Sequence, residues 1–472
     1  MTDLCAKSAI QLAELIRHRE VSPVEVLRAY LDQIDEINPK LNAIVTLAAD
    51  ALEKAREAED AIARGELRGA LHGVPVTVKD TIETSGLRTT SGSVMRSEFV
   101  PKQDAAAVAR LKAAGAIVLG KTNTAEMAMD YTADNPVFGR TNNPYDLSRT
   151  PGGSSGGEGA AIASCMSPAG IGSDLAGSIR IPSHCCGIAG LKPTVGQVPG
   201  EGQFPPSTGP YSLGAAIGPM ARSVGDLHVL FGVLAGSETS ASSARELFEI
   251  AHAGIRRRRV ACYTDDGVAP VTEETRSAVE TAAQALAGAG LIIEQTRPPG
   301  IELGYDLWLK LFSRASVLKL RSVYADYPEK GGDFVRWRLS TADDAPAPSL
   351  DDYINSWLER DRLRAVLVEW MEERPLILAP VGSAPASPHG ALKVTVGERT
   401  LSMFRAFSYS QTFNVFDLPV VVVPAGRSRE GLPIGVQIVG RPFAEESVLV
   451  AAAIIEEALG GWQPPPAFSC QP

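Results

Sequence analysis

The sequence predicts an α/β fold in which helices and a β-sheet form a sandwich. Short apolar runs typical of buried strands occur at 74–78 (VPVTV), 116–119 (AIVL), 376–379 (LILA) and 420–423 (VVVV), and helical patterns separate them. Strand and helix patterns that alternate in this way are typical of α/β proteins. The chain has 472 residues, of which 44% are hydrophobic and 21% charged, as in a folded globular protein with a large core.

Two helices are predicted within the first forty residues. Ser8 with Gln11 and Ser22 with Glu25 have the spacing of capping boxes, and Pro23 occupies the favoured first helical position. Apolar residues then recur at helical spacing at Leu27, Tyr30, Leu31, Ile34 and Ile37.

Charge and cysteine content argue against several classes of protein. The net charge of −10 disfavours a nucleic-acid binder, and the one basic cluster, Arg256–Arg259, precedes an apolar run and is interpreted as the solvated approach to a strand. The six cysteines form no CxxC pair, and no histidine stands at metal-ligand spacing, so neither a disulfide framework, a metal ion nor a cofactor is expected. No window of about 18 apolar residues and no leader pattern occur, which predicts a cytoplasmic protein without a membrane span.

Three short motifs match known patterns without their structural context. Residues 115–122 (GAIVLGKT) match a nucleotide-binding loop, but the residues between the glycines are the predicted strand and not a flexible loop. Residues 152–156 match the GxSxG nucleophile elbow with His389 as the late histidine, but no strand precedes them. Ser316 and Lys319 form an isolated SxxK. An alternative interpretation, based on the glycine-rich segment within 151–194, is a nucleotide- or anion-binding module without hydrolytic activity.

Glycine and serine gather in one segment. Residues 151–194 contain three glycine-plus-serine clusters, and upstream GVPVTVKD places Lys79 at the end of a predicted strand. Glycine permits close approach of the backbone to a substrate, and serine supplies a small reactive hydroxyl. A helix predicted to begin near Gly157 directs its positive end toward Ser154, with Glu158 in its first turn.

These segments resemble the amidase signature family. Residues 152–194 follow its serine- and glycine-rich signature and residues 73–80 its lysine block, with family-like separations (154 − 79 = 75; 178 − 154 = 24). The resemblance also includes 138–146, 218–227 and 418–443 and is weakest at about 240–375. It implies a three-layer α/β/α sandwich around a large mixed β-sheet. It further implies a single domain over 1–472, with N-terminal helices (1–65), a catalytic core (66–235), an irregular, partly helical variable region (236–375) that could cover the pocket, and C-terminal strands and helix (376–472).

The resemblance also implies the roles of three residues. Ser178 is the expected nucleophile, Ser154 the proton relay with a cis bond from Gly153, and Lys79 the base. A lysine acts as a base only when neutral, so Lys79 is expected to be buried and away from any uncompensated carboxylate. Asp80, as the next residue on the strand, is expected to point to the opposite face.

Backbone N–H groups at Leu175, Ala176, Gly177 and Ser178 are the expected oxyanion donors. The family commonly has two glycines before the nucleophile, whereas this chain has Ala176 and Gly177, which predicts a narrower pocket. Asp174 and Arg180 are expected to pair or bond to the loop and hold the turn, with Ser155 as further support.

The expected reaction is cleavage of carboxylic amides, with esters, ureas or carbamates as further substrates. Residues 135–160 look more like the fatty acid amide hydrolase branch than like the amidase subunit of a glutamine-dependent tRNA amidotransferase, which is the alternative. No nucleic-acid partner is expected, and the resemblance makes a homodimer a candidate assembly. The substrate-contact candidates are Met127, Ala128, Tyr131, the loop at 198–213 and the aromatic residues after 300, which are either helix core or a pocket wall. They include Trp308, Phe312, Phe334, Trp337 and Trp357.

Overall fold

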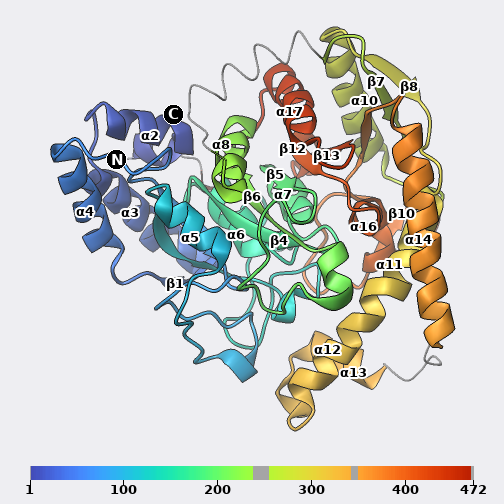
Figure 1. Cartoon of the computed structure of the whole chain (residues 1–472), viewed down its shortest axis with the longest axis horizontal. Helices are drawn as coiled ribbons and strands as arrows, with labels where there is room; N and C mark the ends of the chain where they lie inside the picture. The colour runs from blue at the N-terminus through green and yellow to red at the C-terminus, as the bar shows by residue number, and fades with distance from the viewer. Residues whose placement is uncertain (1, 238–254, 342–348, 469–472) are drawn as a thin grey trace.

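A large mixed β-sheet is the centre of the computed structural model, which describes residues 2–237, 255–341 and 349–468 (Figure 1). Within these residues the sheet has 11 strands. Their order across the sheet is β1 (Ile44–Leu47), β3 (Ile117–Thr122), β2 (Pro75–Lys79), β4 (Ala169–Asp174), β6 (Ala216–Ala221), β5 (Ala189–Lys192), β12 (Val420–Arg427), β13 (Pro433–Gly440), β9 (Leu376–Pro380), β7 (Arg259–Cys262) and β8 (Ile292–Gln295). The four apolar runs of the sequence lie in β2, β3, β9 and β12, so those strand predictions are confirmed.

Strand direction changes along the sheet. Strand β2 pairs in parallel with both β3 and β4, the strands from β4 through β6, β5, β12, β13 and β9 pair antiparallel, and β9, β7 and β8 are again parallel. Because β2 and β4 are parallel neighbours, their carboxyl ends lie at the same edge of the sheet. Lys79 ends β2, and Ser173 and Asp174 end β4.

Helices cover both faces of the sheet. Along β12, Val421 and Val423 belong to one hydrophobic core, while Val420 and Val422 belong to another. This alternation follows from the two-residue period of a strand. The first core includes α8 (Val224–Ala235), α10 (Glu273–Gly288) and α17 (Glu445–Leu459), and the second includes α7 (Arg180–Cys186), α14 (Leu350–Trp370) and α16 (Ser408–Val415). The predicted three-layer sandwich is confirmed.

The N-terminal helices begin where their caps predict. Both capping boxes are formed, at the start of α2 (Ala9–Arg17) and of α3 (Pro23–Leu41). The sequence did not predict α1 (Thr2–Ala6) or the edge strand β1. Three further helices complete this half of the molecule: α4 (Ala51–Ala63), α5 (Ala106–Ala113) and α6 (Gly156–Ala163), the last close to its predicted start.

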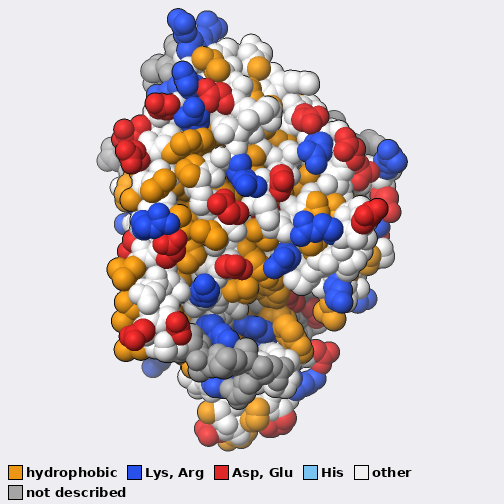
Figure 2. All heavy atoms as spheres, turned by 90° about the vertical axis from the view of Figure 1, so that its right-hand side faces the viewer, with side chains coloured by type: hydrophobic (Ala, Val, Ile, Leu, Met, Phe, Trp, Pro, Cys, Tyr) orange, Lys and Arg blue, Asp and Glu red, His pale blue; other side chains and the backbone are white. Residues whose placement is uncertain are grey.

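The region at 236–375 contributes two strands, β7 and β8, to the main sheet and a group of helices beside it (Figure 1). Residues 238–254 and 342–348 of this predicted variable region lie outside the described residues. The helices are α11 (Gly304–Trp308), a π-helical turn (Leu309–Ser313), α12 (Arg314–Tyr324), α13 (Asp333–Ser340) and α14. A hairpin of β10 (Lys393–Val396) and β11 (Arg399–Ser402) and the short α15 (Met403–Ala406) follow β9. On the face shown in Figure 2, along which α14 runs, apolar side chains are interspersed with charged side chains of both signs.

Candidate active site

A buried lysine and a serine meet at the end of strand β2. The Lys79 Nζ lies 2.6 Å from the Ser154 Oγ and 3.1 Å from the Ser173 Oγ. Lys79 and Ser154 are completely buried, and the peptide bond between Gly153 and Ser154 is cis. A side chain at position 153 would place its Cβ 2.1 Å from the Thr132 carbonyl oxygen, so only glycine fits there.

Burial changes the charge of the lysine. It lowers the pKa of Lys79 from 10.5 to about 7, and the charges of Asp174 and Glu158 oppose this shift. The Asp80 carboxylate accepts hydrogen bonds from the Thr90 N–H and hydroxyl and therefore is engaged away from the lysine. A large fraction of Lys79 is thus neutral near pH 7 and can accept a proton.

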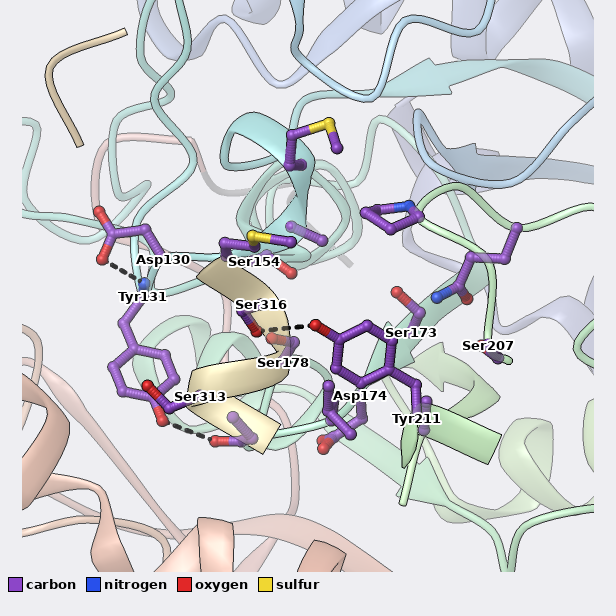
Figure 3. A pocket seen from close by; sticks show the side chains of 18 of the residues that line it. Asp130, Tyr131, Ser154, Ser173, Asp174, Ser178, Ser207, Tyr211, Ser313 and Ser316 are labelled. Atoms are coloured by element: carbon purple, nitrogen blue, oxygen red, sulfur yellow. Dashed lines mark hydrogen bonds between the residues drawn. The ribbon is translucent and has the colours of Figure 1, made fainter. Parts of the chain in front are cut away.

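Ser178 follows strand β4 in a tight turn and lines the same pocket as Ser154 (Figure 3). The turn is joined to the serine-rich segment, because the Ser155 N–H donates to the Ser178 carbonyl at 3.1 Å. The Ser155 hydroxyl lies 3.4 Å from the Ser173 carbonyl oxygen. Gly177 has φ = 104°, which is in the region that favours glycine.

An ion pair lies beneath the turn. Asp174 and Arg180 are fully buried, and Arg180 donates to both carboxylate oxygens, from Nε at 3.0 Å and from Nη2 at 2.9 Å. Burial alone would raise the pKa of Asp174, but Arg180 and the Asn414 amide outweigh it, so the pKa lies below its usual range. Asp174 also accepts from the Ile179 N–H at 3.1 Å, so the pair fixes the backbone around the nucleophile candidate.

One of the four predicted oxyanion donors is already engaged within the protein. The Gly177 N–H donates to the Asp174 Oδ1 at 2.8 Å, so it is not free to serve a substrate oxygen. Asp174, expected only to hold the turn, thereby removes one of the four predicted donors. Among the described residues, the N–H groups of Leu175, Ala176 and Ser178 have no protein partner, and all three residues line the pocket.

Comparison with known proteins agrees with this geometry. The amidase family model matches residues 25–449. The chain belongs to the amidase signature family. It is 33% identical to fatty-acid amide hydrolase 2-A of Danio rerio, over 98% of this chain and 91% of the relative, and 35% identical to a glutamyl-tRNA(Gln) amidotransferase subunit of Roseiflexus castenholzii, over 95% of each. A bacterial aryl acylamidase structure superposes with a TM-score of 0.84 at 27% identity, covering 96% of each chain.

Family membership makes amide hydrolysis the general chemistry of this amidase signature protein. Both kinds of relative match at similar identity, so the comparison favours neither branch. No helix in the described part of the chain has the length and apolarity to cross a membrane. The described residues also hold no cluster of three or more His, Cys, Asp or Glu arranged for a metal ion.

The three substrate-contact candidates of this amidase signature protein all line the pocket. Met127 and Ala128 both have φ = 57°, a backbone conformation that is unusual for residues other than glycine. The Met127 N–H donates to the Ser91 carbonyl at 2.8 Å. The Tyr131 hydroxyl donates to the Ala176 carbonyl at 3.0 Å. Tyr131 therefore links the pocket wall to the turn that carries Ser178.

The loop after β5 and the aromatic region supply the remaining walls. Within the predicted substrate-contact loop at 198–213, five residues line the pocket: Gln203, Pro205, Pro206, Ser207 and Tyr211. Trp308 lines the pocket and stacks on Phe404, with ring centroids 5.9 Å apart. Phe312 is buried in the core, whereas Trp337 is half exposed. Trp308 thus has the predicted wall position and Phe312 the predicted core position, whereas Trp337 has neither.

Of the three short motifs, only the GxSxG match at 152–156 contains a catalytic candidate, Ser154. The segment that matches a nucleotide-binding loop is strand β3, and its Lys121 bonds to the Ile82 carbonyl and the Thr84 hydroxyl. His389 lies 3.2 Å from the Leu147 carbonyl oxygen and does not line the pocket. Ser316 does line it, where it accepts from the Tyr211 hydroxyl at 3.0 Å (Figure 3).

Sequence reasoning missed several residues of the site. Ser173 stands in the recognised signature, and that position was the available signal. Gln411 and Asn414 carried no signal, since they reach the site from distant parts of the chain, whereas Gln203 lies in the loop at 198–213 that was predicted to contact the substrate. Gln411 Nε2 donates to the Tyr131 hydroxyl at 2.6 Å, and Asn414 Nδ2 donates to Asp174 at 2.9 Å.

Proposed function

We propose that this protein is a serine hydrolase that cleaves the C–N bond of carboxylic amides through an acyl-enzyme on Ser178. The observation that carries the proposal is the buried Lys79, whose Nζ is 2.6 Å from the Ser154 hydroxyl and whose pKa is lowered to about 7 by burial. A neutral amine in contact with a serine that shares a pocket with a second serine is the arrangement that base-activated nucleophiles require.

In the proposed acylation, the Ser178 oxygen attacks the carbonyl carbon. Its proton passes to Ser154 while the Ser154 proton passes to Lys79. The unpartnered N–H groups of Leu175, Ala176 and Ser178 are the proposed donors to the oxyanion, and each such donor typically lowers the barrier by about 3 kcal/mol. The protons then return by the same path to the leaving nitrogen as the C–N bond breaks. Water next attacks the acyl-enzyme and gives a proton to the same relay, which returns it to the Ser178 oxygen as the acid leaves.

The walls of the pocket support a substrate with an apolar or aryl group. Tyr131, Trp308 and Phe404 form a continuous aromatic surface, since Tyr131 and Phe404 have ring centroids 5.0 Å apart. This supports fatty or aryl amides over small polar ones, in keeping with the names of the fatty-acid amide hydrolase and aryl acylamidase relatives. Esters and carbamates with the same groups are proposed as secondary substrates.

The direct experiment uses the purified chain alone with a panel of amides, anilides, esters and carbamates. Amide turnover by the wild type, loss of turnover in Ser178→Ala and retained turnover in Ser316→Ala, a matched serine of the same pocket, are expected. Turnover that persists in Ser178→Ala would exclude Ser178 as the nucleophile.

The chain is also similar to a subunit of glutamyl-tRNA(Gln) amidotransferase, so a second candidate function is that of a subunit that acts only with partner chains. Amide turnover by the isolated chain separates the two, because the proposed free-standing enzyme needs no partner. A binding module without hydrolysis would show no turnover and no acyl-enzyme. The homodimer and the cytoplasmic location remain predictions.

A further inference from the structure

One polar side chain of the pocket carries a buried oxygen that has no hydrogen-bond partner among the described residues. Gln203 lines the pocket together with Ser154 and Ser178. Its Oε1 is buried, and it accepts no hydrogen bond from any residue that the structure describes. A buried amide oxygen without a donor is costly and uncommon in folded proteins, so its presence in a pocket calls for an explanation.

The backbone of Gln203 is held on both sides. The Glu83 N–H donates to the Gly202 carbonyl at 2.8 Å, and the Phe204 N–H donates to the Thr81 carbonyl at 2.8 Å. These bonds place Gln203 opposite Ile82 in an antiparallel bridge. Residues 81–83 begin two positions after Lys79, so Gln203 is hydrogen-bonded to the segment that follows the proposed base.

Two contacts of the next residue, Phe204, hold this part of the loop in place. The Ser91 hydroxyl donates to the Phe204 carbonyl at 2.9 Å, and the Arg96 guanidinium lies 4.0 Å from the centroid of the Phe204 ring. Arg96 is itself paired with Glu83 at 3.1 Å. The backbone that carries the Gln203 carboxamide is therefore fixed, so a hydrogen bond from a ligand to this group costs little conformational entropy.

We propose that the Gln203 Oε1 accepts a hydrogen bond from the N–H of the scissile amide. This inference rests on the proposed function and deepens it. An N–H is the one donor that every primary and secondary amide carries, whatever its acyl and amine substituents. The pocket residues around Gln203 include Pro205 and Pro206, which have no N–H to offer it.

The contact gives the pocket a preference for amides that have an N–H. As the carbonyl carbon becomes tetrahedral, the nitrogen lone pair points away from the N–H bond. An acceptor that holds the N–H therefore directs the lone pair to the other side, where the relay through Ser154 delivers its proton. Esters and fully substituted amides lack the N–H and cannot use this contact.

The test measures kcat/KM for an anilide and for the phenyl ester of the same acid, because kcat/KM reports acylation. In Gln203→Met, which keeps the length of the side chain but removes the amide, kcat/KM for the anilide is expected to fall about tenfold, as for a lost hydrogen bond. The ester should change less than about twofold, because it never made the contact. Gln203→Glu, which keeps an acceptor oxygen, should retain the wild-type ratio of anilide to ester within about threefold.

Ser207→Ala is the matched control, since Ser207 lies on the same loop and lines the same pocket. It should leave the anilide-to-ester ratio at the wild-type value. An equal fall for both substrates in Gln203→Met, or no fall for either, would overturn the inference. Gln203→Leu repeats the measurement should the methionine variant not fold. If this inference is wrong, the wild type still hydrolyses both substrates. If the proposed function is wrong, the wild type hydrolyses neither, so the two failures are distinguishable.

Discussion

Replacing Lys79 by methionine is expected to stabilise the protein near neutral pH while it abolishes activity. In the folded chain the pKa of Lys79 is about 7, whereas an unperturbed lysine has a value of 10.5. Between these values the unfolded chain binds a proton that the folded chain does not, so wild-type stability falls as the pH falls from 10.5 to 7 and levels off below 7. Each pH unit in this window corresponds to about 1.4 kcal/mol. From about pH 9 to about pH 7 the wild type should therefore lose roughly 3 kcal/mol that the methionine variant keeps.

The assay is urea denaturation of both proteins at about pH 7, 8 and 9. The difference in unfolding free energy should shift by roughly 3 kcal/mol in favour of Lys79→Met as the pH is lowered over this range. Lys393→Met is the matched control, because Lys393 is exposed on β10 and its replacement relieves no burial. A pH-independent difference between Lys79→Met and the wild type would mean that the lysine is not held neutral, and the reasoning would be wrong.

Three further substitutions test the surroundings of the base. Ser154→Ala should lower kcat/KM for amides by about 10² to 10⁴ with an unchanged unfolding transition, as for a lost proton relay, and near-normal kinetics would exclude that role. Asp174→Asn leaves Arg180 buried without its counter-charge and should cost about 3 to 5 kcal/mol in urea denaturation, whereas a loss below about 1 kcal/mol would show that the ion pair is not what holds the turn. Ala176→Gly removes a methyl group from the pocket wall and should raise kcat/KM for bulky acyl groups relative to small ones; an unchanged preference would show that Ala176 does not narrow the pocket.

Local signals in the sequence predicted local structure well. The serines at 8 and 22 start helices because a side-chain oxygen that caps free N–H groups is a short-range interaction. The apolar runs became strands of the central sheet for a similar reason, since short segments made mostly of apolar residues are stable only when they are buried. Strands β1 and β8 were harder to predict, because edge strands are partly exposed and lack such runs.

The site was only partly predictable, because much of it depends on contacts between distant residues. The proximity of Lys79 and Ser154 was expected from the resemblance to a family. No pattern in the sequence, in contrast, indicated that Asn414 would bond to Asp174, and the predicted loop at 198–213 did not single out Gln203 among its residues. The Gly177 N–H was expected to face a substrate, but a carboxylate three residues earlier takes it instead. That competition can be seen only once the turn has its three-dimensional form.

The most direct test of a neutral lysine acting on Ser178 is the pH dependence of labelling by a fluorophosphonate, with the modified residue identified by mass spectrometry. The label should be found on Ser178, and its rate should rise with pH through about 7 and then level off, because the unprotonated form of Lys79 is the reactive one. A rate that does not change between about pH 6 and about pH 9, or a label on another residue, would contradict the account.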